Sequence, residues 1–186
     1  QKEPALVGIF FEELAKARPQ GATLTDWSAR TGGAVADFAT AARGAEVVFN
    51  VTPGQHSLAA LRAVGADALA GKVLVDVANP LDFSAGMPPF LDSAFSGATS
   101  LGEQIQAEFP AAKVVKAFNT VAAAVMVTPS LIPGAHELFL SGNDAGAKAA
   151  VQGLARDLGW TGFVDLGDIV GARAQEAVLP VWIRLW

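Results

Sequence analysis

Residues 45–54 read Ala-Glu-Val-Val-Phe-Asn-Val-Thr-Pro-Gly, and this stretch decides the fold class. Its first seven residues form a short apolar run rich in branched side chains, and a Thr-Pro-Gly turn follows at once, as is typical of a buried strand. The next segment, 55–64, repeats leucine and valine at a spacing of three, which predicts a helix. Another short apolar run follows at 73–77. The order strand, helix, strand indicates parallel strands joined by a helical connection.

The same alternation continues to the end of the chain. Further strands are expected at 113–118, 136–141 and 162–165, and further helices at 100–109, 121–127, 144–158 and 172–186. Ser100 and Glu103 have the spacing of a capping box for the first of these helices. The pattern predicts an α/β fold with a mostly parallel, doubly wound sheet and helices on both faces. We expect one domain spanning 1–186, with a loop rich in Pro, Gly and Ser at 82–97.

The composition excludes several classes of protein. Of the 186 residues, 52% are hydrophobic and 17% are charged, which argues against a disordered chain. The net charge of −5 and the lack of a Lys/Arg cluster argue against a nucleic-acid partner. The absence of cysteine excludes disulfides and thiolate catalysis. No run approaches the ~18 apolar residues of a membrane span, and no secretion signal is evident, so we expect no membrane association and a cytoplasmic location.

Three of the predicted strand ends carry small or amide side chains followed by tight turns. They lie at 50–54, 76–80 and 117–120. Ligands of open parallel sheets bind outside the carboxyl ends of the strands. For each sequence taken alone, turn formation or helix capping is favoured over contact with a ligand. Their occurrence at one sheet edge leaves two interpretations open, a ligand site or turn chemistry alone.

These segments resemble the NADPH-dependent coenzyme F420 reductase family, also called the F420-dependent NADP oxidoreductases. The resemblance rests on 44–54, 71–83, 100–106, 114–120 and the Asp-Leu-Gly-Asp-Ile run at 165–169 with the Ala-Arg pair after it, and it covers roughly residues 23–186. It implies a Rossmann-like domain that binds NADP, with NAD not excluded. It also implies hydride transfer between this cofactor and a deazaflavin, coenzyme F420, or a similar acceptor.

The resemblance also implies roles for particular residues. Thr52, Pro53 and Gly54 would lie along the ribose and nicotinamide of the cofactor, Ala78, Asn79 and Pro80 would continue that wall, and Asn119 and Thr120 would face the hydride-transfer cleft. Asp165 and Gly167 would lie on the substrate side, on the loop before the final helix. The protein's part in such chemistry is to align two rings and exclude water, so no catalytic residue and no metal ligand is expected.

The chain departs from the family pattern at its beginning. Family members open with a strand and a G-x-G-x-x-G turn whose backbone amides hold the pyrophosphate. No such motif precedes Thr23, Phe10 and Phe11 stand where glycines would be needed, and residues 1–22 are atypical throughout. Family chains also continue past the equivalent of Trp186, so truncation at both ends is one interpretation. We expect residues 5–11 to form a strand that fills the gap left by the family's central first strand.

Two functions remain open at this point. One is an NADP-dependent oxidoreductase of the F420 reductase type. The other is an incomplete or non-catalytic Rossmann-like module that has lost tight dinucleotide binding. The missing glycine-rich turn favours the second for the chain in isolation, and binding of NADPH distinguishes the two.

The remaining candidate residues have ordinary explanations. His56 and His136, the two histidines, are not spaced as metal ligands. Asp76 within a strand is either a buried acid with a shifted pKa or, the favoured interpretation, a carboxylate that accepts backbone N–H bonds. For the tryptophans at 160, 182 and 186, a core or interface role is favoured over stacking on a ligand. The apolar segment 181–186 is the expected surface of a homodimer.

Overall fold

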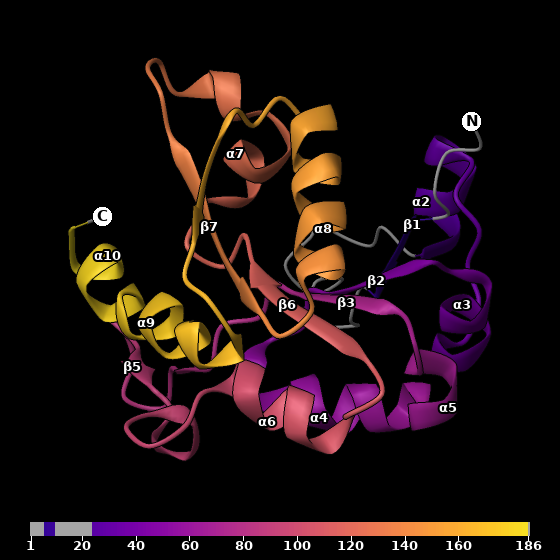
Figure 1. Ribbon diagram of the computed structural model, residues 1–186, viewed down its shortest axis with the longest axis horizontal. Helices are drawn as coiled ribbons and strands as arrows, with labels where there is room; N and C mark the ends of the chain where they lie inside the picture. Colours follow the sequence, from indigo (N-terminus) through magenta and orange to yellow (C-terminus); the bar gives the residue numbers. More distant parts are fainter. Residues whose placement is uncertain (1–5, 10–23, 186) are drawn as a thin grey trace.

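The structure, a computed structural model, describes residues 6–9 and 24–185. Its centre is a six-stranded sheet in the order β1-β2-β3-β6-β7-β8 (Figure 1). These strands are β1 (Leu6–Ile9), β2 (Val47–Asn50), β3 (Val73–Asp76), β6 (Lys113–Ala117), β7 (Glu137–Gly142) and β8 (Gly162–Asp165). Every strand predicted from residue 45 onward is present, with ends within two residues of those expected.

Four strands of the sheet run in one direction and two in the other. β1, β2, β3 and β6 pair in parallel, and Asn50, Asp76 and Lys116 lie in register across three of them. β7 pairs with β6 in the antiparallel sense, with Ser141 opposite Lys116, and β8 is parallel to β7. The sheet is therefore mostly parallel, as predicted. The reversal brings the amino ends of β7 and β8 to the edge where β2, β3 and β6 end.

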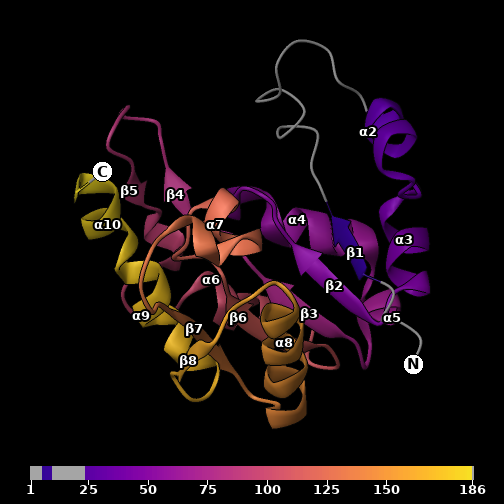
Figure 2. The ribbon, with the colours of Figure 1, turned by 90° about the horizontal axis from the view of Figure 1, so that it is seen from above.

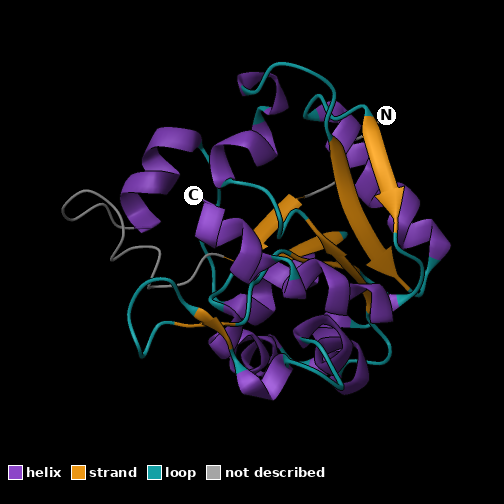
Figure 3. Ribbon diagram, turned by 90° about the vertical axis from the view of Figure 1, so that its left-hand side faces the viewer, coloured by secondary structure: helices purple, strands orange, loops and turns teal. Residues whose placement is uncertain are grey.

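Each face of the sheet is covered by its own apolar cluster. Successive residues of a strand point to opposite faces. Val48, Leu74 and Val114 accordingly belong to one cluster, and Val47, Val75 and Val115 belong to the other. Figures 2 and 3 show helices on both sides of the strands. The prediction of a doubly covered sheet is confirmed.

The helices follow the predicted alternation. The first cluster is covered by α3 (Phe38–Gly44), α4 (Gly54–Val64), α5 (Ala66–Leu69) and α6 (Leu101–Glu108), and the second by α7 (Ala123–Val127) and α8 (Ala145–Asp157). The other helical segments are α2 (Leu24–Thr31), α9 (Ala172–Ala177), α10 (Leu179–Leu185) and the 3₁₀ turns η1 (Ser93–Phe95), η2 (Pro129–Leu131) and η3 (Ile169–Gly171). At the start of α6, the Ser100 hydroxyl accepts the Glu103 N–H at 3.2 Å, so the predicted cap is confirmed.

Two local expectations are corrected by the structure. The expected loop at 82–97 contains part of a short antiparallel hairpin of β4 (Leu81–Asp82) and β5 (Phe90–Leu91). The final helix is interrupted, as predicted, but at Val178 rather than at Pro180. Proline is tolerated in the first turn of a helix because its missing N–H has no helical partner there. Trp186 lies outside the described residues.

The expected strand at 5–11 is present where the structure describes it. Residues 6–9 form β1, which pairs with β2 in the parallel sense. In the described part of the sheet β1 is an edge strand, not a central one, because β2 is its one partner there. Residues 5, 10 and 11 lie outside the described ranges. Across the described residues we find no helix with the length and apolar character needed to cross a membrane.

Candidate functional site

The three predicted turns meet at one edge of the sheet because β2, β3 and β6 are parallel neighbours. The Gly54 N–H donates to the Asn79 carbonyl at 3.1 Å, which joins the first turn to the second. A Cβ on Gly54 would lie 2.5 Å from the carbonyl carbon of Asn79 and from the nitrogen of Pro80. Only glycine permits this approach. The prediction that these turns lie together is confirmed.

Paired amides join the second turn to the third. Asn79 Nδ2 donates to the Asn119 carbonyl at 2.9 Å, and Asn119 Nδ2 donates to Asn79 Oδ1 at 3.2 Å. Asn119 also exchanges hydrogen bonds of 2.8 and 3.2 Å with Gln175, whose Oε1 accepts the Ser141 hydroxyl at 2.7 Å. Gln175 belongs to α9 and Ser141 to β7. The network therefore fastens α9 to the ends of β3 and β6.

A second polar network lies buried under the first turn. Asn50 Nδ2 donates to Asp76 Oδ1 at 2.8 Å and to the Ser57 hydroxyl at 3.0 Å. The Thr52 hydroxyl donates to Asn50 Oδ1 at 2.8 Å. Asp76 Oδ1 also accepts the Ala78 N–H at 3.2 Å, so the favoured interpretation of Asp76 is confirmed. Most of the Asp76 contacts are nevertheless made by side chains.

Beneath these turns lies an ionic cluster of Asp76, Lys116 and Glu176 that the sequence did not predict. Lys116 Nζ lies 2.8 Å from Asp76 Oδ2 and 3.0 Å from Glu176 Oε1, and the three side chains are at most 1% exposed. Nζ also donates to the Ala78 carbonyl at 2.6 Å. The available signal was a lysine within an apolar strand, Lys-Val-Val-Lys-Ala-Phe at 113–118. Buried lysines almost always have charged partners.

The charges within this cluster shift the pKa values of two members. Burial by itself lowers the pKa of Lys116, but the charges of Asp76 and Glu176 outweigh it, and the pKa is raised. Burial raises the pKa of Glu176, and repulsion by Asp76 adds to burial, so that attraction by Lys116 does not compensate. The Glu176 carboxylate accepts the N–H groups of Leu101 and Gly102 at 2.9 and 3.1 Å. These belong to the positive amino-terminal end of α6.

The backbone bends sharply just before Asn119. Phe118 is buried and has φ 66°, in the left-handed region that residues other than glycine rarely adopt. Its carbonyl accepts the Val121 N–H at 3.0 Å, which closes the turn. Such strained residues gather at functional sites. This conformation directs Asn119 back toward Asn79.

The eight predicted cofactor residues divide into a buried group and an accessible group. Thr52, Gly54, Ala78, Pro80 and Asn119 are buried, whereas Pro53, Asn79 and Thr120 are partly exposed. A ligand at this edge would therefore touch the second group, while the first group fixes the turns. In the described ranges, no three His, Asp or Glu side chains are grouped so that they could hold a metal ion.

Thr120 is one of the residues that line a cavity of about 390 Å³. Its walls include Val121 after β6, Phe139 of β7, Trp160 before β8 and Trp182 of α10. His136 and Glu137 also line it. The reversal of β7 explains this composition, because it brings the beginning of β7 beside the end of β6. The cavity is mostly apolar and aromatic, and two ionisable side chains line it.

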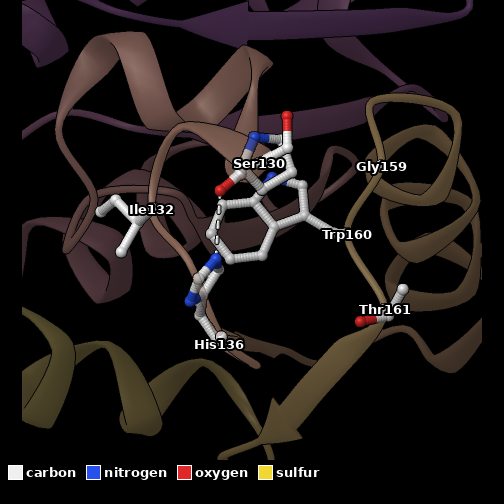
Figure 4. Close-up of a pocket in the computed structure, with 8 residues that line it drawn as sticks. Ser130, Ile132, His136, Gly159, Trp160 and Thr161 are labelled. Carbon is white, nitrogen blue, oxygen red and sulfur yellow. Dashed lines mark hydrogen bonds between the residues drawn. The ribbon is translucent and has the colours of Figure 1, made fainter.

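A smaller cavity of about 200 Å³ lies beside it and shares Ile132, His136 and Trp160 with it. The His136 ring meets the Trp160 indole nearly edge-on, with centroids 6.2 Å apart and planes at 76° (Figure 4). Trp160 is 3% exposed, and its Nε1 donates to the Met126 carbonyl at 2.9 Å. Its predicted core role is confirmed. It also forms a wall shared by the two cavities.

The structure places Asp165 and Gly167 apart from the other predicted residues. Asp165 is the last residue of β8, and Gly167 lies on the loop that follows, as expected; β8 runs against β6, so the chain after Asp165 leads away from the edge with the turns. Lys148 Nζ lies 2.8 Å from Asp165 and donates to the Gly167 carbonyl at 2.9 Å. Slight burial by itself raises the pKa of Asp165. Lys148 and the Gly167 N–H lower this pKa by more, so the net shift is downward. Their role on the substrate side stays a prediction.

Comparisons with known proteins point to reductases that use NADP. The F420-dependent NADP reductase of Methanocaldococcus jannaschii is 30% identical over 145 residues, which are 78% of this chain and 64% of that protein. The metalloreductase STEAP3 of Rattus norvegicus is 35% identical over 144 residues, 74% of this chain and 26% of that protein. The chain thus spans about a quarter of one curated relative and just under two thirds of the other. No family model matches the sequence.

A solved structure agrees over a larger share of the chain. An assigned F420-dependent NADP reductase from Arthrobacter sp. FB24 is 50% identical, with a TM-score of 0.86, and the match covers 97% of this chain and 81% of that chain. The resemblance seen in the sequence and the Rossmann-like fold are both confirmed. The chain belongs to the F420-dependent NADP reductase family.

Proposed function

We propose that this protein transfers hydride between NADPH and a planar acceptor, coenzyme F420 or a similar ring, at the edge where β2, β3 and β6 end. The observation that carries the proposal is the larger cavity, which is lined in part by Thr120. Thr120 follows Asn119, whose amide is paired with Asn79 on the same edge. One ring over the turns and another in the cavity would meet near Thr120. Holding two reacting rings in contact is the main contribution of a protein to such a reaction.

The accessible residues at the edge where β2, β3 and β6 end have chemical groups that suit a dinucleotide. NADPH, when bound, supplies the hydride. Asn79 and Thr120 offer donors and acceptors suited to ribose hydroxyls and to a carboxamide, and Pro53 offers an apolar surface. Pro53 and Asn79 are held by the close contact at Gly54, where the backbones of two turns touch. The accessible residues would bind the cofactor, and the buried ones would keep them in place.

The lining of the larger cavity fits the acceptor better than it fits a sugar or a phosphate. Val121, Phe139, Trp160 and Trp182 offer apolar and aromatic surface to a flat ring. A ring bound against this lining would displace water from it, which strengthens the electrostatic interactions within a site. This supports a ring as the acceptor. F420, a flavin and a quinone all meet this description.

Three finer expectations belong to the same proposal. We propose NADP over NAD and a cytoplasmic location, on the strength of the family. We also propose a homodimer that forms through residues 181–186. In α10, Val181 is 60% exposed, Trp182 36% and Leu185 83%. Apolar side chains this exposed favour burial against another surface.

A cavity-filling variant tests the proposal. Ala122, the N-cap residue that precedes α7, lines the cavity, and Ala124 within α7 is exposed. We expect A122W to lower kcat/KM for the acceptor by about tenfold or more, since the added ring occupies the acceptor's volume. The Kd for NADPH should change by no more than about twofold, and A124W should resemble the wild type. The acceptors tested are F420, FMN and a soluble quinone. Their reduction is measured by the loss of NADPH absorbance.

The alternative function, an incomplete Rossmann-like module, makes the opposite prediction. Such a module would leave NADPH unbound at millimolar concentration, and no acceptor would be reduced. An A122W variant that reduces the acceptor as fast as the wild type would have a different consequence. The proposed reductase activity would stand, but the cavity would no longer be its acceptor site.

A further inference from the structure

We propose that His136 is the acid that gives the acceptor ring its proton as the ring receives hydride, an inference that rests on the proposed function. The notion of a protein without catalytic side chains is thereby revised at one position. A ring that accepts hydride alone carries an added negative charge. One proton from a positioned group removes it.

The place of His136 follows from the sheet topology. It immediately precedes β7, whose reversal brings it to the edge where β6 ends at Ala117. It lines both cavities and is partly buried. Thr120, the proposed meeting point of the two rings, lines the larger cavity with it. His136 is therefore within the space proposed for the acceptor.

Among the described residues, one ring nitrogen of His136 has a hydrogen-bond partner, which leaves the other available. Nε2 lies 3.0 Å from the Pro129 carbonyl, and since a carbonyl only accepts, Nε2 carries a hydrogen. The other ring nitrogen is turned away from this bond (Figure 4). Pro129 lines the smaller cavity and is not among the residues that line the larger one. Nδ1 is therefore the atom free to exchange a proton, with its ring orientation held by Pro129 and Trp160.

Glu137 is the other ionisable group in these walls. Among the described residues, no further ionisable side chain lines either cavity. Imidazole is the side chain that ordinarily exchanges protons near neutral pH, whereas an ordinary carboxylic acid is ionised there and has no proton to give. These facts favour His136 over Glu137 as the donor.

The step balances in atoms and charge. NADPH is the reductant, and it loses hydride, two electrons with one hydrogen nucleus, to become NADP⁺. The imidazolium of His136 breaks its Nδ1–H bond, and a new N–H or O–H bond forms on the acceptor at the position that became negative. His136 is left neutral and takes a proton from solvent before the next turnover. In the reverse direction the neutral ring accepts the same proton.

The test compares His136→Gln and His136→Ala with His56→Gln, which removes the other, exposed histidine. Turnover with the best acceptor of the series and NADPH affinity are measured from pH 5.5 to 8.5. We expect both His136 variants to lose about a hundredfold or more in kcat, and to lose the fall of kcat with rising pH that we expect of the wild type. Their Kd for NADPH should stay within about twofold. Added imidazole should restore part of the turnover of H136A and none of that of H136Q.

Three outcomes are decisive. His136 variants that keep the wild-type kcat and pH profile would overturn the role of His136 and leave the proposed function standing. A loss of turnover with no change in the pH profile and no rescue by imidazole would reduce His136 to a packing residue and also overturn it. A wild type that binds NADPH but reduces no acceptor would overturn the proposed function itself. The H56Q control should match the wild type in each measurement.

Discussion

Replacing Lys116 by methionine removes the one cation of the buried cluster while keeping most of the side-chain volume. Asp76 and Glu176 then face each other without it, and the Ala78 carbonyl loses its partner. Lys113 is a matched control on the same strand. Its side chain is 45% exposed and lies 3.4 Å from Asp144. The two lysines thus differ in burial, with the element that carries them unchanged.

The expected loss follows from burial. Removing one partner of a buried ion pair costs about 3–5 kcal/mol, because the remaining charge has neither water nor a counter-ion. Asp76 keeps its bond from Asn50, and Glu176 keeps two backbone N–H groups, so we expect about 3 kcal/mol rather than the upper end. The exposed pair of Lys113 should contribute less than about 1 kcal/mol. A domain is stable by only about 5–15 kcal/mol in total.

Urea unfolding at pH 7, followed by circular dichroism and tryptophan fluorescence, measures both values. The double variant K116M/E176Q removes one of the two buried charges that K116M leaves without a counter-ion, and it should regain about 0.5–3 kcal/mol relative to K116M. A K116M protein that loses no more stability than K113M would refute the account of the cluster. So would a double variant less stable than K116M, since buried charge without a counter-ion is the stated cause of the loss.

The remaining predictions concern a turn, a carboxylate and a surface. G54A should lose about 1–3 kcal/mol of unfolding free energy, because its Cβ would overlap the backbone of Asn79 and Pro80. G153A, in open space on α8, should be neutral or slightly stabilised. Urea unfolding compares the two variants. Because the pKa of Glu176 is raised above its ordinary 4.5, its folded form binds the proton more tightly and favours folding less as pH rises. The stability of E176Q relative to wild type should therefore improve from pH 4.5 toward neutrality, and the opposite trend would contradict this. V181R should shift sedimentation toward the monomer, and an unchanged dimer would exclude that surface.

Local patterns predicted the strands and helices well. The apolar run at 45–51 became β2, and the spacing of leucines at 55–64 became α4, because both periods are set by the residues that lie on one face of an element. Ser100 and Glu103 formed the expected cap for the same reason, since all its atoms lie within one turn. The meeting of the turns was predictable because parallel neighbours end at one edge.

Features that depend on distant residues escaped prediction. The direction of β7 is set by how residues 128–136 return to the sheet, and no local pattern in those residues indicates that direction. Lys116 and Glu176 lie 60 positions apart, so their pairing appears only once α9 packs on the sheet. The meeting of His136 with Trp160 depends on the parallel pairing of β7 with β8, which the residues precede. Because the reversal of β7 was not predicted, the acceptor cavity could not be predicted from the sequence either.

Binding of NADPH tests the central claim most directly. NADPH is titrated into the wild type and into G54A and G153A, and both cofactor fluorescence and the emission of the tryptophans are followed. The account predicts saturable binding at micromolar concentration for the wild type and G153A, and weaker binding for G54A, whose turns cannot approach each other. No saturation of the wild type up to millimolar NADPH would contradict it.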